Sequence, residues 1–399
     1  MADATPPVLP LDDLLLDPFG AITRARAEGE VAHSDLATVT LSHAAAQELL
    51  TSGAFAPNFV EAIARFGVTS GPFHDWMAMS PLNMDGPAHR EWRALMSRTF
   101  TPRSADRLRP YLAATSLELI DGFAALSDAD GVLDFTAAFA DKLPLLALCE
   151  LIGVPPNDRE QFGRWADSIG KGFNPIELAM CADEVDDATV ALLGYAAGLV
   201  EQRRAEPRDD LVSRIAVVGR EEGFPDEQLV GSVAGLVFAG HETTKMQLGW
   251  AISVLAGHPD VWDGLAADPS SVAAVVDEVM RTRSAVAAFP RGAVVDTEVR
   301  GCPVASGDFA LVSVWGANHD PAVYPDDTFD PTRPPEPAMT FGFGAHYCLG
   351  AGLAKAEVQE ALLALTARLH CPELVEGAEW RPPVGINGPT KLPVRFAAR

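Results

Sequence analysis

The amino-acid sequence predicts a mainly helical fold with a small β region. Helical periodicity dominates from Arg93 to Glu278, and one stretch of roughly thirty residues, 226–256, reads as a single long helix. Short runs of alternating apolar and polar residues occupy 31–41 and 293–315, where glycine and proline interrupt them, so we expect a small sheet beside the helices. The candidate helices are 104–123, 134–151, 157–168, 185–204, 209–219 and 226–256.

Length and composition favour one domain over residues 1–399. The chain has 399 residues, 48% of them hydrophobic, and no long linker rich in proline, glycine or serine. No internal repeat stands out. We therefore expect a single mostly helical domain with one large core.

The long helix is expected to lie buried at the centre. Asp226 is the predicted N-cap and Gly257 the predicted stop, and at ~1.5 Å per residue such a helix spans about 45 Å. Apolar residues surround most of its circumference. Its middle, 239–244, reads Ala-Gly-His-Glu-Thr-Thr, and burying these polar groups without partners costs several kcal/mol. We expect them to face a cavity, water or each other.

Cys348 lies in a glycine-rich loop, 341–350, that leads into a helix beginning near Leu349. Glycines let the backbone crowd around sulfur, and the amides and dipole of a helix N-terminus stabilise a thiolate. The loop is therefore expected to hold a thiolate that binds a soft metal, and the alternative is a buried structural cysteine. The other cysteines are scattered without a C-x2-C pair, which argues against zinc and iron-sulfur sites and favours a single axial thiolate on heme iron; they are Cys149, Cys181, Cys302 and Cys371.

Phe341, Gly344, Cys348 and Gly350 match the F-x-x-G-x-x-x-C-x-G signature of the heme-thiolate monooxygenases, and the chain thus resembles the cytochrome P450 family. The resemblance implies the P450 fold, a helical body around the cofactor. It also implies heme b, iron protoporphyrin IX with Cys348 as axial ligand. Phe341, Gly342 and Gly350 are then expected to contact the heme.

The middle of the long helix resembles the family's oxygen-binding element. Ala239 and Gly240 are expected to let ligand approach the heme, in a helix that is locally distorted. The resemblance implies that Thr243 hydrogen-bonds the activated oxygen and that Glu242 relays protons from solvent. The alternative for Thr243 is a hydrogen bond back along its own helix. His241 is expected to be a bystander.

Four basic residues resemble the family's partners of the heme propionates. In a chain of net charge -25, local cations are needed to hold two carboxylates. Each of these residues taken singly reads as a surface charge, but together they follow the family's order along the chain. They are His89, Arg93, Arg291 and His346.

Glu278 and Arg281 lie three residues apart on one helix face, which is a weak signal on its own. The segment 329–333 resembles the family's third partner. Glu278 is then expected to bridge Arg281 and Arg333 and to pin the loop that carries Cys348. This role is structural.

Charge and composition bear on partners and location. At a pI near 4.6, nonspecific binding to nucleic acid or to an anionic membrane is disfavoured. With no signal core or span of twenty apolar residues, we expect a cytoplasmic bacterial protein. About fifty residues follow Cys348, so we expect no fused reductase but a separate ferredoxin or flavodoxin with its reductase. Arg93, His346 and Lys355 are candidates for its docking.

The expected reaction is O2 activation to hydroxylate, epoxidise or dealkylate a small hydrophobic molecule in bacterial secondary metabolism or catabolism. Aromatic and methionine side chains favour an apolar ligand, aromatic and polycyclic ones included. We expect 285–289 to line one side of the pocket, 386–387 its tip and 173–200 its lid. The expected roof comes from an apolar loop with Phe59, Phe73, Trp76, Met77, Met79, Leu82 and Met84.

Two alternatives stay open. The same fold serves peroxide-driven or oxidative-coupling heme oxidases, and a heme protein can also be a sensor that performs no catalysis. The presence of both Glu242 and Thr243 favours proton-coupled O2 activation, because a sensor does not need them.

Overall fold

The computed structural model describes residues 6–334 and 336–399 and confirms a mainly helical fold with small sheets. The α-helices are α1 Leu11–Leu16, α2 Pro18–Arg26, α3 His43–Thr51, α4 Phe59–Ala64, α5 Pro72–Ala78, α6 Gly86–Thr99, α7 Pro102–Asp121, α8 Phe123–Leu126, α9 Lys142–Ile152, α10 Arg159–Lys171, α11 Pro175–Ala205, α12 Leu211–Glu221, α13 Asp226–Leu255, α14 Pro259–Ala267, α15 Val272–Thr282, α16 Val314–Asn318 and α17 Ala351–Arg368. Short 3-10 or π turns are η1 Thr136–Ala140, η2 Pro156–Asp158, η3 Pro269–Ser271, η4 Met339–Phe341 and η5 Gly344–His346. The strands are β1 Val31–His33, β2 Thr38–Thr40, β3 Phe55–Pro57, β4 Val132–Asp134, β5 Ala288–Ala293, β6 Thr297–Val299, β7 Cys302–Val304, β8 Phe309–Ser313, β9 Glu373–Leu374, β10 Glu379–Trp380, β11 Pro389–Lys391 and β12 Pro393–Arg395.

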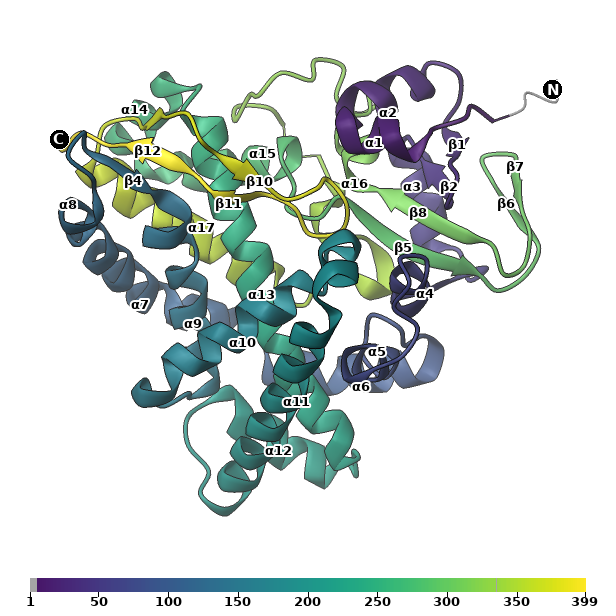
Figure 1. Ribbon diagram of the computed structural model, residues 1–399, viewed down its shortest axis with the longest axis horizontal. Helices are drawn as coiled ribbons and strands as arrows, with labels where there is room; N and C mark the ends of the chain where they lie inside the picture. The colour runs from purple at the N-terminus through teal and green to yellow at the C-terminus, as the bar shows by residue number, and fades with distance from the viewer. Residues whose placement is uncertain (1–5, 335) are drawn as a thin grey trace.

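Helix α13 runs through the middle of the helical body, as its apolar circumference predicts (Figure 1). It packs against α9, α10, α11 and α17. The predicted N-cap is wrong by one residue, because Pro225 occupies the cap in an extended conformation and Asp226 is the first helical residue. The Asp226 carboxylate is instead paired with Arg204 on α11.

The main sheet lies at the opposite side of the molecule from α7 and α8, below α1 and α2 and beside α3 (Figure 1). Its five strands have the order β1-β2-β8-β5-β3. Strands β2 and β8 are parallel, with Thr38 opposite Ala310, and the other pairs are antiparallel. The predicted strands at 31–41 and 293–315 therefore meet in one sheet, with β6 and β7 as a separate hairpin.

All six predicted helices are present, with different ends. Helix α11 starts at Pro175, ten residues before its predicted start, and contains a kink at Cys181. The predicted helix 134–151 begins with η1 and continues as α9, because β4 occupies its first residue. The C-terminal strands β9 to β12 were not predicted, since their two- and three-residue lengths carry no periodicity.

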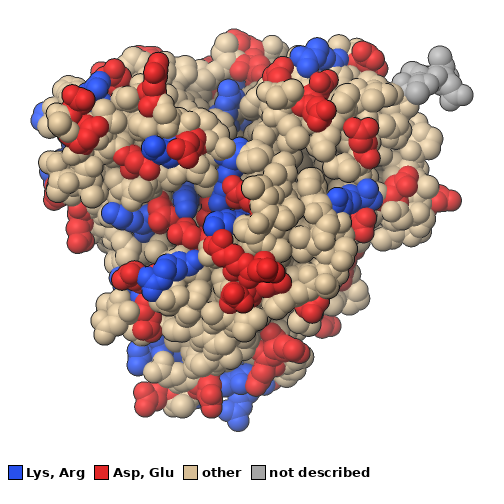
Figure 2. All heavy atoms as spheres, in the orientation of Figure 1, with Lys and Arg blue, Asp and Glu red and all other residues tan. Residues whose placement is uncertain are grey.

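The distribution of surface charge and the character of the helices can be compared with the expectations about nucleic acid and membranes. Acidic and basic side chains are interspersed on the face drawn in Figure 2, so the net negative charge is spread out there. Among the described residues, no helix combines the length and the apolar character that crossing a membrane requires.

Candidate functional site

The loop that carries Cys348 has the tight backbone that its glycines predict. Gly342, which follows the turn η4, and Gly344, the first residue of η5, adopt φ values of 71° and 72°, which favour glycine. The amide of Cys348 donates to the carbonyl of Phe341 at 2.9 Å. Gly350 then occupies the N-cap of α17. The loop thus folds back on itself and places Cys348 just before a helix N-terminus.

The surroundings of Cys348 affect the pKa of its thiol in opposite directions. Burial raises the pKa of its thiol, whereas the amide of Gly350, the charge of Arg93 and the amide of Ala351 act to lower it. The residue keeps accessible surface because it borders an internal cavity. A bound metal deprotonates a coordinating thiol outright, so this donor fits a metal ion placed in that cavity.

The cavity, with a volume of 520 Å³, lies between the Cys348 loop and α13. Ala239, Gly240 and Thr243 line it from α13, while Phe341 and Cys348 line it from the loop. The lining is mostly apolar, which suits a flat hydrophobic macrocycle and a hydrophobic substrate. Two predicted groups that lie about a hundred residues apart in the sequence therefore face one space.

All four predicted propionate partners line the same cavity: His89, Arg93, Arg291 and His346. The rings of His89 and His346 stack with centroids 3.8 Å apart. Burial lowers the pKa of Arg291 to about 10, and within the described part of the chain its guanidinium donates one hydrogen bond, to the carbonyl of Pro290 at 2.8 Å.

These basic residues fit an anionic ligand. Among the described residues, neither Arg93 nor Arg291 makes an ion pair with a carboxylate, and the Nε2 atom of His346 is buried without a hydrogen-bond partner. Asp85 lies 3.6 Å from that atom. Burying unpaired cations is costly, and two carboxylates of heme relieve that cost. The donor set and the cations together fit heme.

The oxygen-binding element is α-helical throughout 239–244, so the expected local distortion is not observed. The hydroxyl of Thr243 lines the cavity and donates to the carbonyl of Ala239 at 2.6 Å. This back-bond is the alternative that the sequence left open, and it forms here within a regular helix. A Cβ atom on Gly240 would lie 2.7 Å from Leu148, so this glycine also lets α9 approach α13.

Glu242 points away from the cavity wall that Thr243 lines. It is fully buried and does not border the cavity. The Arg381 guanidinium lies 2.5 Å from one of its carboxylate oxygens and 3.0 Å from Glu177 on α11. Lys245 and His241 lie 3.9 Å from its other oxygen. Direct proton transfer from Glu242 to the cavity therefore requires this side chain to change its orientation.

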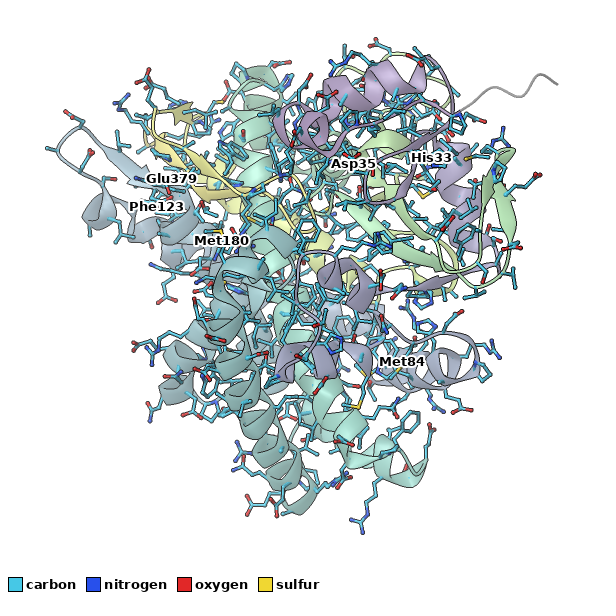
Figure 3. All side chains as sticks on the ribbon, turned by 45° about the vertical axis from the view of Figure 1, so that its right-hand side comes forward. His33, Asp35, Met84, Phe123, Met180 and Glu379 are labelled. Carbon is cyan, nitrogen blue, oxygen red and sulfur yellow. The ribbon has the colours of Figure 1, made fainter. Side chains whose placement is uncertain are left out.

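The ion pairs around Glu242 involve segments that lie far apart in the sequence, with Glu177 on α11 and Arg381 near the C-terminus. Figure 3 labels Met180 on the first turns of α11 and Glu379 on β10, next to the segment that carries Arg381. The ion pair of Glu177 with Arg381 joins these two segments over α13. No sequence motif indicated Arg381, because its segment has no periodicity.

Glu278 and Arg281 form the predicted ion pair, with nitrogen–oxygen distances of 2.8 and 2.7 Å. Arg333 is the looser third member at 3.8 Å from Glu278, and Asp327 adds a contact to Arg281 at 2.9 Å. The hydroxyl of Thr340, at the start of the Cys348 loop, donates to the carbonyl of Met280 on the same helix. The network is in place to pin the loop.

The predicted pocket walls are confirmed in part. All of 285–289 lines the cavity, as do Ile386, Phe59, Leu82 and Phe173. The segment 59–84 is not a loop but contains α4 and α5, so most of its apolar side chains pack in the core or face out. Phe73, Trp76 and Met77 are buried in the core, Met79 is exposed, and neither Met84 nor Asn387 borders the cavity.

Some cavity residues were missed by the sequence reasoning. Glu357 on α17 lies four residues after Leu353, so helical spacing places both side chains on the helix face that borders the cavity. Burial raises the pKa of Glu357 well above its usual range, which favours the neutral form of this acid. Leu11 and Leu14 on α1 also border the cavity, and nothing in their sequence indicated it.

Comparisons with known proteins agree with this geometry. The cytochrome P450 family model matches residues 181–370. The luteothin monooxygenase of Streptomyces thioluteus is 33% identical over 385 residues, covering 94% of this chain and 92% of that protein. The mycinamicin IV hydroxylase/epoxidase of Micromonospora griseorubida is 35% identical over 322 residues, covering 78% and 79%.

A solved structure shows the same fold. The cytochrome P450 CYP109Q5 from Chondromyces apiculatus superposes with a TM-score of 0.88 at 26% identity, covering 99% of this chain and 100% of that chain. Sequence similarity thus extends over nearly the whole chain, and the structural similarity does too. The chain therefore belongs to the cytochrome P450 family of heme-thiolate monooxygenases.

Proposed function

We propose that Cys348 is the axial ligand of heme b in this monooxygenase and that Thr243 faces the oxygen-binding side. The observation that carries this proposal is the single cavity that Cys348 and Thr243 line from opposite walls. Phe341, Gly342 and Gly350 hold the thiolate side, and Ala239 and Gly240 give ligand access on the other. When bound, heme supplies the redox chemistry that activates O2.

We assign the propionates to His89, Arg93, Arg291 and His346. The two arginines without carboxylate partners support this assignment, because each gains a charge-assisted hydrogen bond. Arg291 is the strongest candidate of the four, since it is buried and, among the described residues, forms no ion pair, although the charge of Asp85 acts on it from a distance.

Thr243 supplies the hydroxyl nearest to the reacting oxygen. Its proton now goes to the carbonyl of Ala239, so its oxygen can accept a hydrogen bond from water in the cavity. Glu242 is the source of protons for this site. It delivers them when its side chain leaves Arg381, or through water that reaches it.

The substrate is a hydrophobic molecule of the kind found in secondary metabolism. Three aromatic rings from distant segments meet beside the cavity: Phe173 stacks on Phe238 of α13 with centroids 3.9 Å apart, and Phe59 lies 5.2 Å from Phe173. Phe59, Phe173 and Phe238 all line the cavity. The names of the relatives support a substrate of this class, since one is a luteothin monooxygenase and the other a mycinamicin IV hydroxylase/epoxidase.

A separate ferredoxin or flavodoxin supplies the electrons, and it docks on the side of the Cys348 loop. Of the predicted docking residues, Lys355 is paired with Asp277 at 2.8 Å and His346 is largely buried. Arg90, on the exposed face of α6, is better placed than either of them. Arg93 is half-buried and serves the heme instead.

The test is a titration of the ferric protein with a panel of hydrophobic compounds, followed by turnover with ferredoxin, its reductase and NADPH. A spin-state shift and an oxygenated product are expected with at least one compound. Arg90→Glu is expected to slow reduction by an acidic ferredoxin without changing the substrate titration. Product formation that needs peroxide but neither ferredoxin nor NADPH would overturn the proposal.

A further inference from the structure

A second polar cluster lies on the side of α13 opposite the cavity. It consists of Asp141, Asp167, His241 and Lys245, and we call it the His241 cluster. Lys245 lies 2.7 Å from Asp141 and 2.9 Å from Asp167. The Nε2 atom of His241 lies 3.0 Å from the carbonyl of Asp141 and 3.3 Å from its carboxylate. The cluster thus joins α13 to α10 and to the residue before α9.

The geometry of this cluster is that of an ion-pair network. Ligand atoms of Asp141, Asp167 and His241 lie within 4.8 Å of one another, as a metal site requires. However, the ammonium group of Lys245 already contacts both carboxylates, and it neutralises the charge that would attract a cation. The short distance from Nε2 to the Asp141 carbonyl also uses that nitrogen as a donor.

The other ring nitrogen of His241 faces Glu242. Nδ1 is buried without a hydrogen-bond partner and lies 3.9 Å from a carboxylate oxygen of Glu242. A Cβ atom on Gly170 would lie 2.5 Å from that same oxygen, so this glycine leaves the space beside α10 that the carboxylate occupies. A movement of about 1 Å brings Nδ1 and the carboxylate into hydrogen-bond range.

The charges around His241 favour a proton on its ring. Four carboxylates lie in or beside the cluster, those of Asp141, Asp167, Glu177 and Glu242, and Lys245 and Arg381 are the fixed cations that pair with them. Burial acts to lower the pKa of His241, but the hydrogen bond to Asp141 and the charge of Glu242 outweigh it, and the pKa is raised. The imidazolium is then the third cation of the network.

We propose that His241 stores the proton that Glu242 delivers to the oxygen-binding site. This inference rests on the proposed function. In the transfer, the Nδ1–H bond of the imidazolium breaks and an O–H bond forms on Glu242, leaving a neutral ring that still donates Nε2–H to the Asp141 carbonyl. Solvent then returns a proton to the ring; the partly exposed carboxylates of Asp141 and Asp167 are where the cluster meets solvent. His241 acts through Glu242 and does not touch the reacting atoms.

The first test is His241→Gln in the heme-loaded protein, with the panel compound that gives the largest spin-state shift. Glutamine keeps a donor for the Asp141 carbonyl but does not titrate. We expect product per NADPH to fall at least about tenfold and hydrogen peroxide release to rise. His370→Gln, a variant of an exposed histidine, is the matched control and should behave as the parent protein.

The pH profile separates this role from a structural one. Coupling in the parent protein should hold below the raised pKa of His241 and fall as the ring loses its proton at higher pH, and His241→Gln should lack this decline. In a Glu242→Gln background, His241→Gln should not lower the product per NADPH any further, because the two groups act in series. Parent-like coupling and an unchanged pH profile in His241→Gln would overturn the inference.

A spectroscopic test does not depend on turnover. In protein labelled with ¹⁵N-histidine and held in the reduced carbon monoxide form, the His241 signal is assigned by its absence in His241→Gln. At neutral pH the ring should be doubly protonated, and Glu242→Gln should lower the pH at which it titrates. A neutral ring at pH 7 would contradict the inference even if the monooxygenase activity is confirmed, whereas absence of any product in the parent protein would instead refute the proposed function.

Discussion

The guanidinium of Arg381 lies 2.5 Å from the carboxylate of Glu242, and both side chains are buried. The arginine comes from the segment after β10, and the glutamate comes from the middle of α13. Glu177 shares the same arginine at 3.0 Å. This contact holds the Glu242 side chain away from the cavity. It therefore fixes the position of the proposed proton source, and it also links the C-terminal segment to α13.

Removing Arg381 is expected to destabilise the protein. Arg381→Met leaves a buried carboxylate without its cation, a change that costs about 3–5 kcal/mol. The free energy of unfolding is measured by denaturant titration. The double variant Arg381→Met/Glu242→Gln should recover much of the loss, and a double variant that is as unstable as the sum of the single changes would contradict this account.

Thr243→Ala is expected to uncouple electron use from product. The variant removes the hydroxyl that lines the cavity but leaves the helix intact, so substrate binding and NADPH use should continue. Loss of one proton-transfer group lowers the rate of the step that it serves by about a hundredfold or more. Thr243→Ser keeps the hydroxyl and is the control. Equal yields of product per NADPH in both variants would show that the hydroxyl has only a structural role.

Arg291→Leu should weaken heme binding and leave the heme-free protein no less stable. The arginine is buried and has no anion of its own, so the bound state loses a charge-assisted hydrogen bond of about 1.5–3 kcal/mol. That corresponds to roughly ten- to hundredfold faster heme release, which is measured by transfer to apomyoglobin. Unchanged release would remove Arg291 from the propionate site.

Acid should destabilise the heme-free protein through His346. Burial, His89 and Arg291 lower the pKa of His346 from 6.5 to about 4. Its neutral form is therefore favoured by folding, and this stability is present above pH 6.5 and lost as the pH falls toward 4. The change is on the order of 3 kcal/mol at 1.36 kcal/mol per pKa unit. His346→Gln should flatten this part of the pH dependence of unfolding.

Much of the architecture could be predicted from the sequence because long periodic segments carry it. Helix α13 and the glycine loop around Cys348 have strong local signals, and both lie where they were expected. The segment 59–84 was misread as a loop because its helices α4 and α5 are only six and seven residues long. The single-domain organisation over 1–399 stays a prediction.

The orientation of the Glu242 side chain could not be predicted from the sequence. The motif places the acid on α13, but its orientation depends on Arg381 and Lys245, and Arg381 comes from a distant segment with no pattern of its own. Likewise, His241 was expected to be a bystander, and only tertiary structure shows that its ring lies between Asp141 and Glu242. Long-range ion pairs leave no periodic signal.

The absorption spectrum of the reduced protein with and without carbon monoxide tests the central claim most directly. A thiolate opposite carbon monoxide is expected to give a strongly red-shifted band that is absent in Cys348→Ala and kept in Cys302→Ala, a control at a buried cysteine that does not border the cavity. A band typical of histidine ligation, or an unchanged spectrum in Cys348→Ala, would contradict the assignment of Cys348 and the site built around it.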